Sequence, residues 1–204
     1  MTTAGASLIT NLGLLWLAAL PLMGSPGPAT LGSAAMGAAF GARRGLPYVF
    51  GIIAGTATVL CLMASGVTAV VLTVPALSSA ITLAAAAYIL YLAWRIATAP
   101  PLSKAGTAAK APAFPGGYFL AVANPKAFAV LGAIYAGNTV VPGDLALDAA
   151  AKIAALTLVI VVVNLIWLVF GSMIAALLHD PVKARITNIA FAVLLVASVG
   201  LALI

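Results

Sequence analysis

Two short motifs in a very apolar chain combine proline with groups that could bind a small polar solute. They are Pro26-Gly27-Pro28 and Asn124-Pro125-Lys126. Proline has no backbone N–H, so inside a helix it leaves the carbonyl four residues earlier without a partner. We therefore expect free carbonyl oxygens at Leu22, Gly24 and Ala121. In a membrane interior such groups must be satisfied by protein or by a water-lined cavity.

Lys126 is the most informative single residue, because it lies midway along the apolar stretch 115–137. A lysine at the centre of a bilayer costs about 2.5–3.5 kcal/mol on insertion scales, and such residues usually face an interior or an aqueous path. There its ammonium would attract an anionic group of a substrate. The alternative is that the span begins nearer Asn124 and that Lys126 reaches the cytoplasmic surface.

Other polar side chains inside the apolar stretches are few, and they include Thr30, Thr56 and Asn164. Asn164 must find a partner, and the sequence leaves open whether this is a neighbouring helix or a substrate. Trp167 lies well away from the membrane interfaces where tryptophan is enriched. Core packing and the lining of a cavity are both open for its indole.

The composition places these residues in a membrane. Of the 204 residues, 65% are hydrophobic and only 6% are charged, whereas soluble domains carry about 25% charged residues. This excludes an ordinary soluble enzyme, a disordered chain and a nucleic-acid-binding module. Cys61 is the only cysteine, which excludes an internal disulfide and a thiolate cluster. We expect no metal, no cofactor and no enzymatic activity.

The spacing of charges divides the chain into membrane spans. A helix needs about 20 apolar residues to cross the hydrocarbon core, and Pro75 divides the long uncharged block before Arg95. The stretches lack the alternation of a barrel strand. The sequence therefore predicts an all-α integral membrane protein with six transmembrane helices. The expected spans are 7–40, 46–72, 77–98, 115–137, 149–177 and 186–204.

The positive charges predict the orientation of the spans. With six spans, the first, third and fifth loops lie on one side, and they hold seven of the nine basic residues. The opposite side has Lys152, offset by Asp144 and Asp148. By the positive-inside rule, both termini face out. The seven cytoplasmic charges are Arg43, Arg44, Arg95, Lys104, Lys110, Lys183 and Arg185.

The linker 99–114, rich in proline and basic residues, divides a single transmembrane domain, 1–204, into two sets of three spans. Repeat 1 covers about 7–98 and repeat 2 about 115–204. An odd number of spans in each set gives the two repeats inverted topology. Each set opens with a helix broken at proline, which is the pattern of transporters with inverted repeats.

The sequence resembles the LysE/RhtB family of bacterial amino-acid exporters. The resemblance rests on the two proline motifs, on Ala127 after the second, and on the segment 87–95 (AYILYLAWR). It implies a six-helix inner-membrane exporter of amino acids or close derivatives, driven by the proton gradient. Members often carry acidic residues where this chain has Thr56 and Asn164, so we expect no carboxylate relay inside the membrane.

We therefore predict a transporter whose partners are a small amino-acid-like solute and the lipid bilayer, with a homo-oligomer left open. Two alternatives are a membrane assembly or lipid-associated protein of the same fold, and an intramembrane enzyme, for which no nucleophile–base pair is visible. The predicted substrate-binding residues come from both broken helices and the spans beside them. They are Pro26, Gly27, Pro28, Thr30, Thr56, Asn124, Pro125, Lys126, Asn164 and Trp167.

Overall fold

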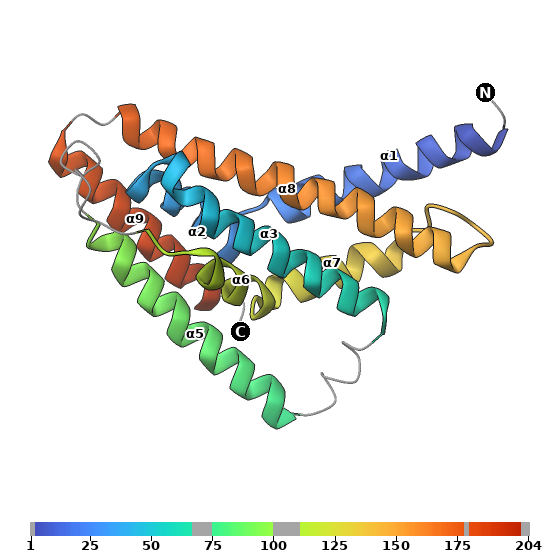
Figure 1. Ribbon diagram of the computed structural model, residues 1–204, viewed down its shortest axis with the longest axis horizontal. Helices are drawn as coiled ribbons and strands as arrows, with labels where there is room; N and C mark the ends of the chain where they lie inside the picture. Colours follow the sequence, from blue (N-terminus) through green and yellow to red (C-terminus); the bar gives the residue numbers. More distant parts are fainter. Residues whose placement is uncertain (1–2, 67–74, 100–110, 178–179, 201–204) are drawn as a thin grey trace.

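The computed structural model describes residues 3–66, 75–99, 111–177 and 180–200, and these form helices joined by short turns (Figure 1). The described part contains no strand. The helices are α1 (Thr3–Gly24), α2 (Pro28–Phe40), α3 (Ala42–Ala64), α5 (Pro75–Ala97), α6 (Phe114–Val122), α7 (Pro125–Gly137), α8 (Leu145–Leu177) and α9 (Pro181–Gly200).

Three helical segments within the described residues are long and apolar enough to cross a membrane. They are Ser7–Gly24, Ala42–Ala64 and Leu145–Ala175. The pair α6 and α7 is a fourth candidate, bent by 60° at its break. The apolar helical segment described in α5, Ala86–Ala97, is shorter than these candidate spans. The all-helical membrane class is thus confirmed, while the six-span inverted repeat stays a prediction.

Both expected helix breaks are present, and a proline begins the second half of each broken helix. Gly27 is the N-cap of α2 with Pro28 at its start, and Asn124 is the N-cap of α7 with Pro125 at its start. Proline suits the first helical position because its missing N–H has no helical partner there. The expected span 7–40 is therefore two helices, as is 115–137.

Capping also explains why two helices start earlier than charge spacing predicts. The α8 helix starts at Leu145, not 149, because the Asp144 carboxylate accepts the Leu147 N–H at 3.0 Å. The α9 helix starts at Pro181, not 186, because the Asp180 carboxylate accepts the Val182 N–H at 2.8 Å. An aspartate at an N-cap stabilises a helix start by about 1 kcal/mol.

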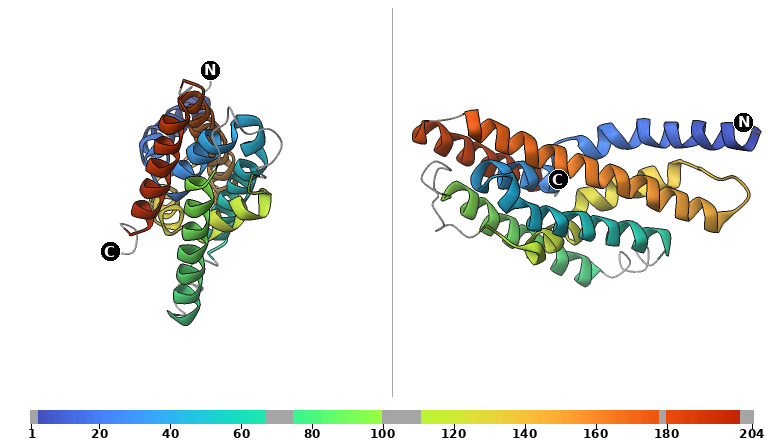
Figure 2. Two further views of the ribbon diagram at one scale, coloured as in Figure 1. Left: turned by 90° about the vertical axis from the view of Figure 1, so that its left-hand side faces the viewer. Right: turned by 45° about the horizontal axis from the view of Figure 1, so that its top comes forward.

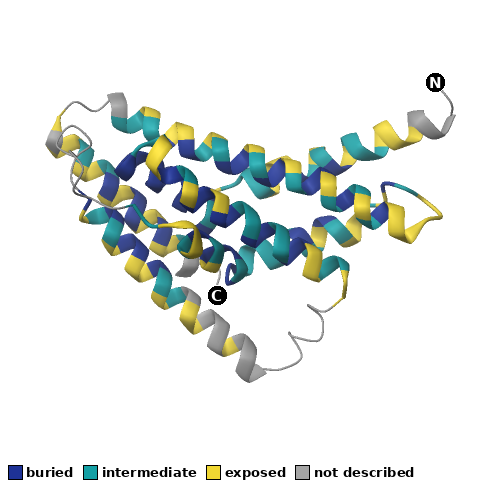
Figure 3. Cartoon of the chain, in the orientation of Figure 1, coloured by how far each residue is buried: buried dark blue, intermediate teal, exposed yellow. Residues whose placement is uncertain are grey.

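The α2 helix is the most buried element, and every residue in it except Ala29 is buried (Figure 3). It packs on α8 through glycines: a Cβ added at Gly37 would overlap the Leu168 carbonyl, and one at Gly171 would overlap the Ala34 carbonyl. Small residues of this kind let membrane helices approach closely. The α5 and α9 helices also pack against each other (Figure 2).

The helix ends that carry basic residues lie together at one end of the bundle. These are the α2–α3 junction, the end of α5 and the start of α9, whereas the α7–α8 turn and the start of α1 lie at the other end (Figure 1). At the α2–α3 junction Gly41 has φ 80°, a conformation that glycine accepts readily. Lys104 and Lys110 of the predicted linker lie outside the described residues.

Candidate functional site

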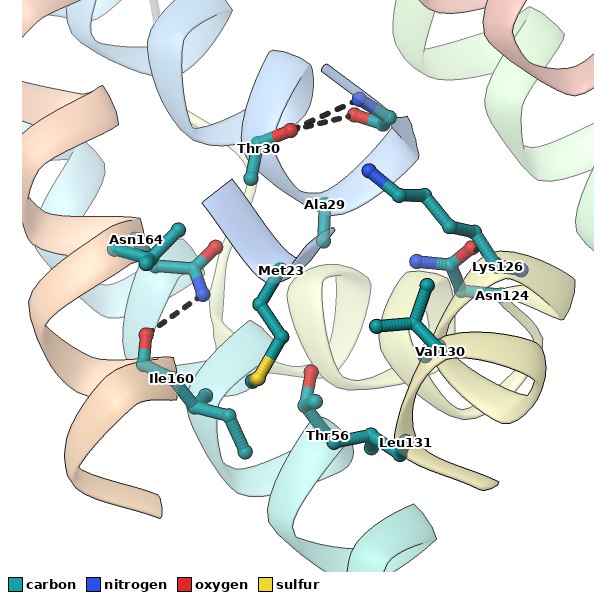
Figure 4. A pocket seen from close by; sticks show the side chains of 13 residues that line it. Met23, Ala29, Thr30, Thr56, Asn124, Lys126, Val130, Leu131, Ile160 and Asn164 are labelled. Atoms are coloured by element: carbon teal, nitrogen blue, oxygen red, sulfur yellow. Dashed lines mark hydrogen bonds between the residues drawn. The ribbon is translucent and has the colours of Figure 1, made fainter. Parts of the chain in front are cut away.

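The first helix break is fixed by the side chain of Thr30, three residues into α2. Its hydroxyl accepts the Gly27 N–H at 2.9 Å and lies 3.2 Å from the Gly27 carbonyl oxygen (Figure 4). It also lies 3.2 Å from the Ser25 carbonyl oxygen. Thr30 is buried. The segment between α1 and α2 is therefore held in one conformation by its own helix.

The carbonyls that we expected to be free each have a donor, which corrects that prediction. The Leu22 carbonyl accepts the Ser25 hydroxyl at 2.8 Å, and the Gly24 carbonyl accepts the Trp167 indole N–H at 3.1 Å. The Ala121 carbonyl accepts the Asn124 N–H at 3.2 Å. The expectation was wrong because it treated the prolines as interior residues of continuous helices. Pro28 and Pro125 instead start new helices, and Pro26 lies in the bend between α1 and α2.

The ammonium of Lys126 joins the two breaks. Its Nζ donates to the Ser25 carbonyl at 2.6 Å, to the Ser25 hydroxyl at 2.7 Å and to the Pro26 carbonyl at 3.1 Å. Lys126 is half-buried and is the second residue of α7, where its own N–H donates to the Asn124 side-chain oxygen at 3.1 Å. It therefore faces the first break, as the interior alternative for this residue predicts.

A cavity of about 50 Å³ lies beside this junction (Figure 4). This is space that the centres of water molecules can reach, so the cavity can hold water. Its walls come from both broken helices, from α3 and from α8. The lining residues are Met23, Gly27, Ala29, Thr30, Thr56, Asn124, Lys126, Ala127, Val130, Leu131, Ile160, Val163 and Asn164.

Two lining residues present hydrogen-bonding groups that have no partner within the described part of the chain. Asn124 uses its side-chain oxygen as the α7 cap, which leaves its amide NH₂ as a donor. Thr56 is 8% exposed, and its hydroxyl points into the space between Met23 and Val130 (Figure 4). The cavity thus offers neutral donors beside the Lys126 cation.

Asn164 bonds to a neighbouring helix, one of the two roles that the sequence left open, and it also lines the cavity. Its amide donates to the Ile160 carbonyl at 2.8 Å, and its oxygen lies 3.0 Å from the Ser33 hydroxyl of α2. Trp167 is not among the lining residues. Its indole instead stabilises the end of α1 through the Gly24 carbonyl.

Six of the ten predicted site residues line the cavity; the other four are Pro26, Pro28, Pro125 and Trp167. Of these four, Pro26 supplies a carbonyl to Lys126, and Pro28 and Pro125 start the helices that hold the site. The prediction missed Ser25, which supplies two of the three Lys126 contacts. Its position before Pro26 was the available signal, since the carbonyl of a residue at a helix end lacks an intrahelical partner.

Comparisons with known proteins identify the family of the chain. Neither the curated proteins nor the solved structures contain a match to the chain. Residues 20–204 match the family described as LysE type translocator, so both helix breaks and every residue of the cavity lie inside the matched region. The chain is a multi-pass membrane protein that belongs to the LysE translocator family.

Proposed function

We propose that this protein is a secondary transporter of the bacterial inner or plasma membrane that exports amino acids or close derivatives, with neutral zwitterions preferred. In this proposal the chain has six spans in two inverted repeats of three, and both termini face out. The family assignment supports membrane transport. The finer points rest on the cavity and on the distribution of charge.

The observation that carries the proposal is a cavity between two helix breaks that offers both kinds of hydrogen-bonding group. Carbonyl oxygens of Ser25 and Pro26 can accept from an ammonium. The Asn124 amide, the Thr56 hydroxyl and the Lys126 ammonium can donate to a carboxylate. Broken helices that meet near the middle of a transporter commonly form its substrate site.

The charge of the cavity favours a neutral solute over lysine or arginine. Lys126 is the only charged residue that lines it, and no carboxylate is among the lining residues. A dibasic amino acid would bring a net positive charge toward Lys126 in a region with little water, where unpaired charge is costly. The two charges of a neutral amino acid can both be met there.

Coupling to the proton gradient would have to use the same residue. The cavity lining contains Lys126 and no other titratable side chain, so a proton taken up or released at this site would be carried by its amine. An imposed pH gradient that drives uptake by native proteoliposomes, and does not drive it in Lys126→Met, is the expected result.

The alternative of a lipid-associated protein with the same fold predicts grooves facing the lipid and no central cavity. The cavity found here is lined by residues from five helices: α1, α2, α3, α7 and α8. A site shared by so many helices favours a solute over a lipid as the ligand.

Solute counterflow in proteoliposomes tests the proposal. The panel is threonine, homoserine, leucine, glutamate, lysine and arginine, and we expect exchange of neutral solutes in preference to lysine and arginine. Lys126→Ala and Pro28→Ala should exchange at least tenfold more slowly than the native protein. Lys183→Ala, an exposed lysine outside the cavity, is the control. Unchanged exchange in both site variants, or exchange of lysine and arginine alone, would contradict the proposal.

A further inference from the structure

Lys126 has all three of its ammonium N–H groups directed at oxygens of one short segment. The oxygens are the Ser25 carbonyl, the Ser25 hydroxyl and the Pro26 carbonyl, at 2.6, 2.7 and 3.1 Å from Nζ. An ammonium has three donors and no acceptor. These three oxygens, which we call the ammonium site, therefore satisfy the whole group.

The ammonium site is held in place by residues of α1 and α2, and not by Lys126. The Ser25 hydroxyl gives its proton to the Leu22 carbonyl, so its lone pairs are left to accept from an ammonium. Thr30 fixes the Gly27 N–H and lies against the Ser25 carbonyl. The oxygens would keep their positions if another ammonium replaced that of the lysine.

Gly27 leaves the space through which the lysine side chain reaches this site. A Cβ added at Gly27 would lie 2.6 Å from Lys126 Cδ and 3.0 Å from Nζ. The φ of Gly27 is −175°, which any residue adopts, so the glycine is required for space and not for its backbone conformation. A larger residue at position 27 would collide with the Lys126 side chain in this position.

The ammonium site holds a cation with neutral oxygens only. The one ion pair within the described residues joins Asp148 to Lys152, in the first turns of α8. Neutral carbonyl and hydroxyl oxygens bind an ammonium less strongly than a carboxylate does, because both partners of a salt bridge are charged. The Lys126 ammonium is therefore easier to displace than one in a salt bridge. Another primary ammonium has the same three donors, so it would form an equal set of hydrogen bonds.

The side chain of Lys126 also forms part of the cavity wall. This side chain is flexible. Its movement would both enlarge the cavity and free the ammonium site.

We propose that Lys126 stands in for the α-ammonium of the substrate while the cavity is empty. The entering amino acid places its own ammonium against Ser25 and Pro26, and the displaced lysine pairs with the substrate carboxylate. This inference rests on the proposed function and specifies its substrate class: solutes with a primary ammonium next to a carboxylate. Because Lys126 joins α7 to the α1–α2 break, the two breaks separate only when a substrate has replaced it.

Chemical replacement of the lysine side chain tests the first half of the proposal. Lys126→Ala removes the carbons and nitrogen that propylammonium contains. We expect propylammonium to raise the unfolding temperature of purified Lys126→Ala by about 2–4 °C, the shift that about 1 kcal/mol gives a chain of this size. It should not stabilise the native protein or Lys183→Ala. Tetramethylammonium, which has no N–H, should stabilise none of them.

Gly27→Ala keeps the charge but displaces the side chain, and it serves if Lys126→Ala does not fold. Its added Cβ should move Lys126 out of the ammonium site and make its amine react faster with an amine-specific reagent than in the native protein. Equal effects of propylammonium on native protein and Lys126→Ala would overturn the proposal. Native-like reactivity of Lys126 in Gly27→Ala would overturn it as well.

The second half is tested with the amino acid that the native protein exchanges. Propylammonium should compete with it for binding to Lys126→Ala, and its trimethylammonium analogue should not be exchanged by the native protein. Stabilisation by propylammonium without competition, or exchange of the trimethylated solute, would refute a shared site. Failure of the native protein to exchange any amino acid would refute the proposed function instead. The stabilisation of Lys126→Ala by propylammonium does not depend on transport, so it still tests the ammonium site in that case.

Discussion

Trp167 shows how a residue outside the cavity controls the shape of the site. Its indole N–H donates to the Gly24 carbonyl, the last residue of α1, from a position 143 residues later in the chain. Trp16 makes the same kind of bond, from its indole to the Ala155 carbonyl at 3.3 Å. The two bonds have the same chemistry, but only that of Trp167 holds the end of a broken helix.

Replacement of each tryptophan by phenylalanine separates these roles. Each change removes one hydrogen bond and should cost about 1 kcal/mol of stability. We expect Trp167→Phe to slow solute exchange severalfold, because the Gly24 carbonyl becomes free beside the site. Trp16→Phe should exchange at the native rate. Thermal unfolding and counterflow measure the two effects, and equal exchange rates in both variants would contradict this role for Trp167.

Sequence reasoning predicted which residues gather at the site better than it predicted their bonds. The proline motifs indicated that Lys126 and the 26–28 segment belong together, and Lys126 does bind Pro26. Which carbonyls stay free depends on donors that only packing supplies. Trp167 satisfies the Gly24 carbonyl from another helix, so no local pattern could have excluded Gly24.

At the scale of helices, glycines set how closely the bundle packs around the site. A Cβ at Gly51 would overlap the Phe114 carbonyl, and one at Gly117 would overlap the Tyr48 carbonyl. These contacts join α3 to α6, as Gly37 and Gly171 join α2 to α8. The helices that carry both breaks are thus placed by backbone-to-backbone contact, where no side chain can adjust.

Gly171→Ala should therefore destabilise the protein, whereas Gly132→Ala should not. The added Cβ at Gly171 meets backbone of α2, and overpacking of this kind costs about 1–3 kcal/mol. At Gly132 the nearest atom is the Met63 methyl at 3.6 Å, an ordinary contact, and alanine favours a helix. Unfolding temperatures in detergent compare the two variants. A Gly171→Ala protein as stable as Gly132→Ala would show that α2 and α8 can separate freely.

Helix positions were predicted well where prolines occur and less well where charges were used as boundaries. Pro28 and Pro125 begin helices near the expected breaks, because a missing N–H permits few other positions. Asp144 and Asp180 cap helices that begin before the apolar stretches and continue through the charged residues that follow. A charged residue marks the end of an apolar stretch, but the helix can continue past it.

Asp148 and Lys152 form a buried pair at the turn between α7 and α8. The pair measures 2.8 Å, and Asp148 also accepts the Val140 and Val141 N–H groups. Lys152 donates to the Tyr135 carbonyl near the end of α7 at 3.0 Å. The sequence suggested only opposite charges here. In the structure the pair connects the end of α7 to the start of α8.

Asp148→Asn should destabilise this connection strongly, because it leaves the Lys152 charge buried without its partner. Loss of one member of a buried pair costs about 3–5 kcal/mol, and removal of both members costs less. We expect the double variant Asp148→Asn with Lys152→Met to unfold at a higher temperature than Asp148→Asn alone. A double variant less stable than Asp148→Asn would mean that Lys152 contributes chiefly through the α7 carbonyls.

At the scale of the whole molecule, the distribution of charge gives the bundle a direction. The start of α3, the end of α5 and the start of α9 lie at one end of the bundle (Figure 1). They carry Arg43, Arg44, Arg95, Lys183 and Arg185. Asp144 and the Asp148–Lys152 pair lie at the other end, where α1 also starts. Charges that the sequence placed in alternate loops thus gather at one end in space.

The positive-inside rule converts this direction into a prediction of topology. Basic residues close to span ends stay in the cytoplasm during insertion, so the end that carries the arginines should be cytoplasmic. The opposite end then faces out, and with it the start of α1. An even number of spans would place the C-terminus on the same side. The ammonium of Lys126 is bonded within the site and is not counted among the charges that set the orientation.

Reporter fusions measure this topology directly. A reporter enzyme that is active only outside the cytoplasm should be active when fused before Met1 or after Ile204, and inactive when fused after Ala99, at the end of α5. Activity at one terminus alone would mean an odd number of spans, and would remove the inverted relation between the two halves. Activity after Ala99 with two inactive termini would reverse the whole bundle. The cavity would be the same in a reversed bundle. The proposed direction of transport, which is export, would no longer follow from the family alone.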